Sequence, residues 1–352
     1  MPLTLIPGEY IEMSVIPPLL EISDLCVTFP LDEGLVKAVD GVNLTIGKET
    51  VVGVVGESGC GKSVTAQSIL RIVPHPGRID KGKILFHRFT GRADQKQETV
   101  DIAQLNPTGK SIRAIRGKDI AMIFQEPMSS FSPLYTIGSH ISEAILEHQN
   151  MSKKAAHELA IELLAKVGIA NPARRVDQYP HELSGGMRQR AMIAVAISCN
   201  PALLIADEPT TALDVTIQAQ ILDLMRSLQE EIGMSILFIT HNLGAVAQIT
   251  DRIAIMYLGK IMEEGQVGEI FHNPQHPYTQ DLLNAIPRIG KTRHQRLAAI
   301  GGVIPNPFER PAGCAFHPRC KRFMAGICDA NIPEMMELNA DHKVRCFLMQ
   351  EK

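Results

Sequence analysis

Short, continuously apolar runs alternate with segments of helical periodicity along most of the chain. The runs are rich in β-branched residues, which is typical of parallel strands buried on both faces. Segments 64–73 and 216–232, which lie between such runs, have apolar residues at helical spacing. This alternation predicts an α/β fold built on a parallel sheet. The strand-like runs are 50–56, 119–125, 202–207, 235–240 and 252–257.

Other stretches depart from this alternation. The segments "LLEISDLCVTF" and "VKAVDGVNLTI" are interrupted by polar residues and joined by a Gly- and Asp-bearing turn, which predicts antiparallel strands. Between about 136 and 182 the strand-like runs give way to helical spacing that ends near Gly168, so we expect a helical subdomain there. The polar run 91–101 predicts a solvated loop, and prolines after about 276 predict irregular structure.

Length and charge narrow the classes of protein. A chain of 352 residues exceeds one ordinary domain. From the patterns above we expect a leader over 1–18, a main domain over 19–275 and an extension over 276–352. A net charge of −3 without a long basic run argues against nucleic acid as a partner. The leader lacks a basic region and carries Glu9 and Glu12, and no run reaches eighteen apolar residues. We therefore expect neither signal peptide nor membrane span, and a reducing cytosol in which grouped cysteines favour metals over disulfides.

The segment "GESGCGKS" at 56–63 follows a predicted strand and opens a predicted helix. It fits the G-x-x-x-x-G-K-[ST] pattern, in which backbone N–H groups and the helix N-terminus surround phosphate oxygens. Lys62 would reach the β- and γ-phosphates, and the Ser63 hydroxyl would bind Mg²⁺. The predicted ATP-binding residues of this segment are Gly56, Ser58, Gly59, Cys60, Gly61, Lys62, Ser63 and Val64.

The strand-like run "LLIADE" ends in two carboxylates. Asp207 would hold Mg²⁺ through its water shell, because hard cations prefer oxygen ligands. Glu208 would orient and polarise the water that attacks the γ-phosphate. Two solvated acids after a strand are common by themselves, but the complete phosphate loop upstream favours the catalytic interpretation.

Three further motifs complete a resemblance. "LSGGMRQR" (183–190), "MIFQEP" and "FITHN", together with the two motifs above, resemble the ATPase subunits of ABC transporters over about residues 20–270. The resemblance implies an α/β P-loop ATPase core with an antiparallel β subdomain and a helical subdomain, here followed by a small Cys-containing C-terminal region. It also implies a head-to-tail dimer in which each ATP lies between the phosphate loop of one subunit and Ser184, Gly185 and Gly186 of the other.

The resemblance implies roles for single residues as well. His241 would contact the γ-phosphate and the attacking water, Gln125 would sense Mg²⁺, and Asp214 would link the two ATP sites. Phe29 stands where the family stacks an aromatic ring on adenine, with plain strand packing as a close competitor. Asn242 is a departure, because the family more often has Asp after the histidine.

A finer resemblance extends over nearly the whole chain after the leader. "EPTTALDVTIQAQI" (208–221), "FHNPQHPYTQDLL" (271–283) and "RPAGCAFHPRC" (310–320) resemble ATPase subunits of bacterial dipeptide and oligopeptide importers, a family that includes nickel and glutathione systems. It implies a peripheral protein at the cytoplasmic face of the inner membrane. Its partners would be a second, homologous ATPase subunit, two membrane permeases and, indirectly, an extracytoplasmic binding protein. A nickel or glutathione importer and a DNA-acting, non-transport ATPase remain as alternatives.

Four of the seven cysteines, Cys314, Cys320, Cys328 and Cys346, lie in the last forty residues with spacing C-x5-C-x7-C-x17-C. Four thiolates can hold a four-iron cluster, whereas structural zinc sites favour closer pairs. The family resemblance implies a [4Fe–4S] cluster; zinc and unliganded thiols remain alternatives, with His317 and His342 as further candidate ligands. A proline-rich segment without its own core favours a structural staple, and a redox role stays open. The remaining three, Cys26, Cys60 and Cys199, are expected to be small buried apolar residues.

Overall fold

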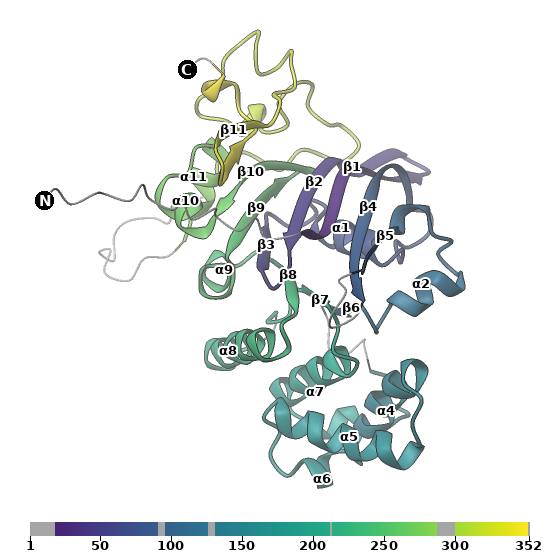
Figure 1. Ribbon diagram of the computed structural model, residues 1–352. Helices are drawn as coiled ribbons and strands as arrows, with labels where there is room; N and C mark the ends of the chain where they lie inside the picture. The colour runs from purple at the N-terminus through teal and green to yellow at the C-terminus, as the bar shows by residue number, and fades with distance from the viewer. Residues whose placement is uncertain (1–17, 91–95, 126–130, 212, 287–299, 351–352) are drawn as a thin grey trace, which may run out of the picture.

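Two sheets and a separate group of helices make up the protein (Figure 1). The structure, a computed structural model, describes residues 18–90, 96–125, 131–211, 213–286 and 300–350. The predicted leader therefore lies almost wholly outside the described residues. The larger sheet has the order β11 (Met336–Asn339), β12 (His342–Val344), β10 (Lys260–Gln266), β9 (Arg252–Tyr257), β3 (Val51–Val55), β8 (Ser235–Thr240), β7 (Leu203–Asp207) and β6 (Ile120–Ile123).

The parallel part of this sheet confirms the prediction from the apolar runs. Strands β9, β3, β8, β7 and β6 all run parallel, and every residue of β3, β7 and β8 is buried. The two predicted helices are α1 (Lys62–Ile69) and α8 (Val215–Ile232). Burial on both faces explains why these strands have no polar alternation.

The smaller sheet is antiparallel, as predicted, with the order β2 (Gly34–Gly47), β1 (Pro18–Leu31), β4 (Arg78–Thr90) and β5 (Lys96–Asp101). The prediction of a solvated loop over 91–101 is wrong for its second half, because Lys96–Asp101 pairs with β4. This is an edge strand, and polar residues are tolerated there since one side faces solvent. The short elements η1 (Ile102–Gln104) and α2 (Lys110–Ile115) follow it.

The helical subdomain consists of α4 (Ile137–His148), α5 (Lys153–Lys166), α6 (Pro172–Arg175), η2 (Pro180–Glu182) and α7 (Gly185–Ile197). Thr136 and Ser152 cap the first two helices, each accepting a hydrogen bond from a backbone N–H one turn later. In Figure 1 this group lies at the end of the molecule opposite the C-terminal region. The predicted helical subdomain is therefore confirmed.

The C-terminal part contains more regular structure than predicted. The helices α9 (Leu243–Ile249) and α10 (Val267–His272) are followed by α11 (Pro277–Asn284). Pro277 does not interrupt regular structure but begins α11, because a proline in the first helical turn needs no N–H partner. Further on, β12 pairs with β10 and so extends the main sheet. Figure 1 shows this region lying over β10, α10 and α11; it also contains η3 (His317–Arg319) and η4 (Phe347–Met349).

None of the helices in the described part of the chain has the length and apolar character needed to cross a bilayer.

Candidate active site

The phosphate loop connects β3 to α1 at the carboxyl edge of the parallel sheet. Gly61 caps α1 with a φ of 106°, a left-handed conformation that favours glycine. A Cβ on Gly56 would lie 2.1 Å from the carbonyl oxygen of Met256, and one on Gly61 would lie 2.3 Å from that of Ala38. Both glycines are therefore required by close backbone approach.

The buried Lys62 side chain turns back into the loop. Its Nζ donates to the carbonyl oxygens of Gly56 and Glu57 at 2.8 and 3.0 Å. The loop therefore encloses the ammonium group of Lys62. This group lies close to the two carbonyl oxygens and belongs to the first residue of α1. This arrangement suits an anion with several oxygens.

Ser63 and Asp207, two of the three residues predicted at the Mg²⁺ site, contact each other, whereas the third, Gln125, contacts Glu208. The Ser63 hydroxyl donates to Oδ1 of Asp207 over 3.0 Å, from α1 to the end of β7. Burial raises the pKa of Asp207, and the hydrogen bond from Ser63 acts against this. A hydroxyl and a carboxylate oxygen brought together beside the phosphate loop are hard ligands of the kind that Mg²⁺ prefers, so the donor set fits this cation.

Glu208 is surrounded by donors. Nε2 of Gln125 donates to its Oε2 over 3.2 Å, Oγ1 of Thr211 donates to the same oxygen over 2.9 Å, and Nδ1 of His241 donates to Oε1 over 3.1 Å. Burial acts to raise the pKa of Glu208, but the hydrogen bonds from His241 and Thr211 outweigh it and lower the pKa. The structure thus holds this carboxylate ionised and brings the three predicted catalytic residues together.

Asn242 caps α9 directly after His241. Its Oδ1 accepts from the backbone N–H groups of Gly244 and Ala245 at 2.9 and 3.3 Å. An aspartate can make the same two bonds, so the departure from the family pattern keeps the local structure.

Ser184, Gly185, Gly186 and Asp214 lie together in a second group. They line one groove of about 510 Å³ that includes no residue of the phosphate loop. Ser184 caps α7 and Asp214 caps α8, so two helix N-termini meet at this groove. Within one chain, the predicted residues therefore form two separate half-sites.

Phe29, the predicted adenine contact, is half-buried in β1. Its ring packs against Gly77, where an added Cβ would lie 2.5 Å from the ring. The packing interpretation thus has direct support, and the adenine contact stays a prediction.

Two residues that contact the loop at Glu57 were missed from the sequence. The backbone N–H of Glu57 donates to the Tyr278 hydroxyl over 3.1 Å, and the Glu57 carboxylate pairs with Arg319 at 2.7 Å. Tyr278 and Arg319 lie inside motifs quoted for the family resemblance, but nothing in their local pattern indicates a contact more than 220 positions away.

The four terminal cysteines are free thiols that influence one another. Burial raises the pKa of Cys314 and of Cys346 to about 11, and nearby thiols add to the rise. Among the described residues, which include all four, no group of three or more His, Cys, Asp or Glu side chains is arranged to hold a metal ion. This arrangement does not support the predicted [4Fe–4S] cluster.

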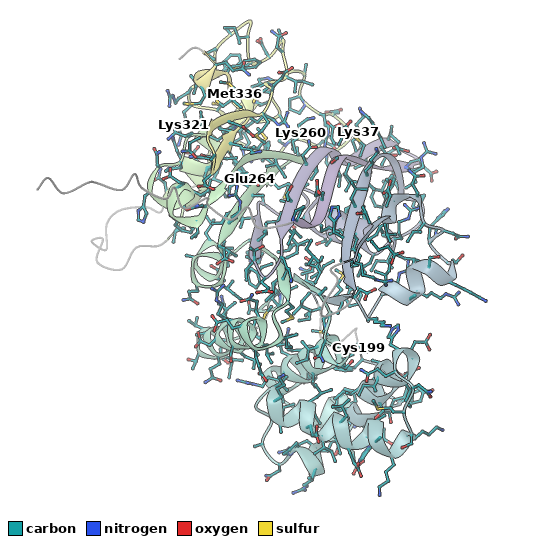
Figure 2. The ribbon with its side chains drawn as sticks, in the orientation of Figure 1. Lys37, Cys199, Lys260, Glu264, Lys321 and Met336 are labelled. Atoms are coloured by element: carbon teal, nitrogen blue, oxygen red, sulfur yellow. The ribbon has the colours of Figure 1, made fainter. Side chains whose placement is uncertain are left out.

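The other candidate ligands and thiols have structural contacts. His317 Nδ1 bonds the Cys314 carbonyl, and His342 pairs with Glu263. Cys60 is buried as predicted, whereas Cys26 and Cys199 are only half-buried, contrary to expectation. Cys199 follows α7 (Figure 2), and its half-buried thiol donates to the carbonyl oxygen of Ala144.

Comparison with known families finds two matches along the chain. Residues 39–211 match the ABC transporter family, and residues 262–328 match the family described as the oligopeptide/dipeptide transporter C-terminal region. The first match covers the phosphate loop, Gln125, the Ser184 motif and Glu208. The second covers Tyr278, Arg319 and three of the four terminal cysteines.

Similar proteins match over nearly the whole chain. A putative peptide import ATP-binding protein of Brucella melitensis is 49% identical over 95% of this chain and 98% of its own length. The dipeptide transport ATP-binding protein DppD of Bacillus subtilis is 45% identical, with 95% of each chain covered. Among solved structures, a dimeric ATP-binding cassette in a post-hydrolysis state, bound to ADP and phosphate, matches with a TM-score of 0.60 and 25% identity over 70% of this chain and 98% of its own.

Proposed function

The chain belongs to the ATP-binding proteins of ABC transporters, in the oligopeptide and dipeptide import group, and we propose that it hydrolyses ATP to drive uptake of short peptides through membrane permeases. The relatives are named for peptide import, and the solved cassette was captured with ADP and phosphate. A DNA-acting ATPase, one of the alternatives above, has no support among these relatives.

One observation carries the assignment of the chemistry. The carboxylate of Glu208 is hydrogen-bonded to Gln125 and His241, while the adjacent Asp207 is hydrogen-bonded to Ser63 at the phosphate loop. This places an ionised acceptor and a pair of hard oxygen ligands at the same edge of the sheet as Lys62. Hydrolysis of a phosphoanhydride needs these groups together, because positioning and charge stabilisation supply most of the catalysis.

The roles of the residues follow from these contacts. Lys62 and the loop N–H groups bind and orient the phosphates of ATP. Glu208 accepts a hydrogen bond from the attacking water and orients it towards the γ-phosphate. His241, which the carboxylate holds through Nδ1, would contact the γ-phosphate with its other ring nitrogen. Ser63 and Asp207 would hold Mg²⁺, which when bound neutralises phosphate charge.

The second half of the site would come from another subunit. Ser184, Gly185, Gly186 and Asp214 line a groove separate from the phosphate loop, so a head-to-tail partner can place its own loop there. The N-termini of α7 and α8 at this groove favour an anion. We propose a second, homologous ATPase subunit as this partner. Its recovery as a different polypeptide in the purified complex would support a heterodimer, and one type of ATPase chain only would reject it.

The decisive test of the chemistry is Glu208→Gln. Glutamine keeps the size and accepts a hydrogen bond from Thr211 but cannot act as an ionised acceptor. We expect ATP binding to persist while turnover falls by about a hundredfold or more, within the usual contribution of general acid–base catalysis. Asp223→Asn, a change in the middle of α8, is the matched control. Unchanged turnover of the Glu208 variant would refute the assignment.

The surface of the helical subdomain fits the predicted permease contact. A groove of about 680 Å³ runs along α4 and reaches Lys153 and His157 of α5. Beside it, Leu134 is 79% exposed and Tyr135 58% exposed. We propose that a cytoplasmic helix of the permease packs here, which places the protein at the cytoplasmic face of the inner membrane. Leu134→Asp should then remove the permeases from the purified complex and leave ATP binding intact.

Two finer parts of the proposal need their own measurements. Uptake by the reconstituted transporter should be competed by dipeptides or oligopeptides; competition by nickel or glutathione alone would favour the alternative cargoes. A [4Fe–4S] cluster is proposed from the family resemblance alone, because no group among the described residues is arranged to hold a metal ion. Anaerobically purified protein should contain about four irons and four sulfides per chain, and zinc or no metal would reject it.

A further inference from the structure

An arginine of the C-terminal region reaches the phosphate loop. Nη1 and Nη2 of Arg319 donate to the two carboxylate oxygens of Glu57 at 2.7 and 3.0 Å, across 262 positions of sequence. The Arg319 side chain is only 3% exposed and that of Glu57 21%. A two-fold, charge-assisted contact of this kind fixes the relative orientation of both groups.

The Arg319 guanidinium is held on its other sides as well. Nε donates to the carbonyl oxygen of Gly301, and Nη1 donates to the Tyr257 hydroxyl over 3.3 Å. The group also lies over the rings of Tyr257 and Phe316, at 5.7 and 5.9 Å from their centroids. These contacts hold the guanidinium in the orientation in which it meets the Glu57 carboxylate.

The C-terminal region makes a second contact with the same loop residue. Tyr278, fully buried in α11, accepts a hydrogen bond from the backbone N–H of Glu57. Burial raises the pKa of Tyr278, so its hydroxyl stays protonated. The carbonyl of Glu57 in turn accepts from Lys62. The side chain and the N–H of Glu57 are thus held by the C-terminal region, while its carbonyl holds the lysine of the loop.

We propose that the C-terminal region holds Glu57 of the phosphate loop, neutralising its carboxylate through Arg319 and fixing its backbone N–H through Tyr278, so that ATP affinity depends on this region. This rests on the proposed function, because it requires ATP to bind at this loop. Without Arg319, the carboxylate of Glu57 would stand uncompensated beside the phosphates and repel them, and poor solvation there increases the repulsion. Arg319 acts through Glu57 and is a positioning residue.

A double-mutant experiment separates this role from simple anchoring of the tail. Equilibrium binding of Mg·ATP is measured on the purified full-length chain for Arg319→Met, Glu57→Gln and the two together. Arg319→Met should raise Kd about tenfold, and adding Glu57→Gln should return Kd to within about threefold of wild type, because both charges are then removed. An Arg319→Met chain that binds ATP as well as wild type, or a double variant as weak as the single one, would overturn the proposal.

Lys321→Met is the matched control. Lys321 is two positions from Arg319 in the same region (Figure 2), but its 67% exposed side chain pairs with Asp281 at 2.7 Å instead of the loop. ATP affinity should not change in this variant. A loss equal to that of Arg319→Met would show that any lost cation in the region weakens binding, and would overturn the specific role of Arg319.

Two more variants keep the test decisive. If Arg319→Met does not fold, Tyr278→Phe serves in its place, because it removes only the hydroxyl that accepts from Glu57. The Kd for Mg·ATP should rise about threefold. Unchanged affinity of this variant would overturn the proposal. Lys62→Ala tests the ATP site itself. If Lys62→Ala binds ATP normally, the proposed site is wrong. If it loses ATP while the Arg319 and Tyr278 variants bind normally, only the positioning role is wrong.

Discussion

Replacing His342 by glutamine should loosen the last strands of the main sheet in a pH-dependent way. His342 begins β12 and is 1% exposed; its Nε2 lies 2.7 Å from Oε1 of Glu263 and its Nδ1 3.6 Å from Glu269. The fully buried Glu263 carboxylate also accepts from the backbone N–H groups of Gln275 and His276, at 2.6 and 3.0 Å. His342 is therefore the side chain that supplies a cation to this buried carboxylate.

The size and sign of the effect follow from this contact. A hydrogen bond to a charged group contributes about 1.5–3 kcal/mol, and glutamine keeps a donor but loses the charge, so we expect a loss of about 1–2 kcal/mol. The hydrogen bond with Glu263 raises the pKa of His342, and burial acts against it. The stabilisation is then complete below the unfolded pKa of about 6.5 and is lost as pH rises through the higher folded pKa.

Hydrogen exchange of the β10–β12 ladder, where Glu263 pairs with Val344, measures this directly as a local opening free energy. The difference between wild type and His342→Gln should be largest near about pH 6 and shrink towards about pH 9. Lys343→Gln is the control, because Lys343 is the neighbour of His342 but pairs with Glu337 at the exposed surface instead of with the buried Glu263. A difference of the same size at both pH values would refute the charged state of His342.

Three more changes test the site. Gly56→Ala should abolish ATP binding in an equilibrium assay, because its Cβ would lie 2.1 Å from the carbonyl oxygen of Met256; normal affinity in a folded variant would contradict this. Asn242→Ala should cost about 1 kcal/mol of stability in thermal unfolding and lower turnover, whereas Asn242→Asp, which keeps the cap of α9, should not. Ser63→Ala should raise the Mg²⁺ concentration for half-maximal ATPase activity by about tenfold, and Ser63→Thr should restore it.

The sequence was most informative where function depends on local backbone geometry. The loop around Lys62 and the turn after β7 need particular residues at fixed spacing, so the motifs predicted Ser63 and Asp207 as magnesium ligands, and the family resemblance added His241 to the site of Glu208. The structure brings Ser63 to Asp207, and His241 to Glu208, within hydrogen-bond distance. The parallel strands were predictable for the same reason, since burial on both faces leaves a continuous apolar run.

Contacts made by the distant C-terminal region could not be predicted in this way. Arg319 stands in an irregular, proline-containing segment, and its bond to Glu57 depends on how the chain returns to the loop after α11. Pro277 was misread because the same residue type that ends a helix also begins one. The edge strand β5 was missed because solvent-facing strands need not be apolar.

Glu208 shows how local strain is combined with these contacts. It has a φ of 47°, in the left-handed region, although it is not a glycine, and this conformation costs about 1–2 kcal/mol. Its backbone N–H donates to the carbonyl of Ile239 over 2.8 Å, which ties the turn to β8. Beside this turn, Asp207 meets Ser63 and the Glu208 carboxylate meets Gln125. A glycine would adopt this backbone conformation without strain but would carry no carboxylate. The strained conformation of Glu208 is therefore explained by the place in which it holds the carboxylate, beside Gln125 and His241.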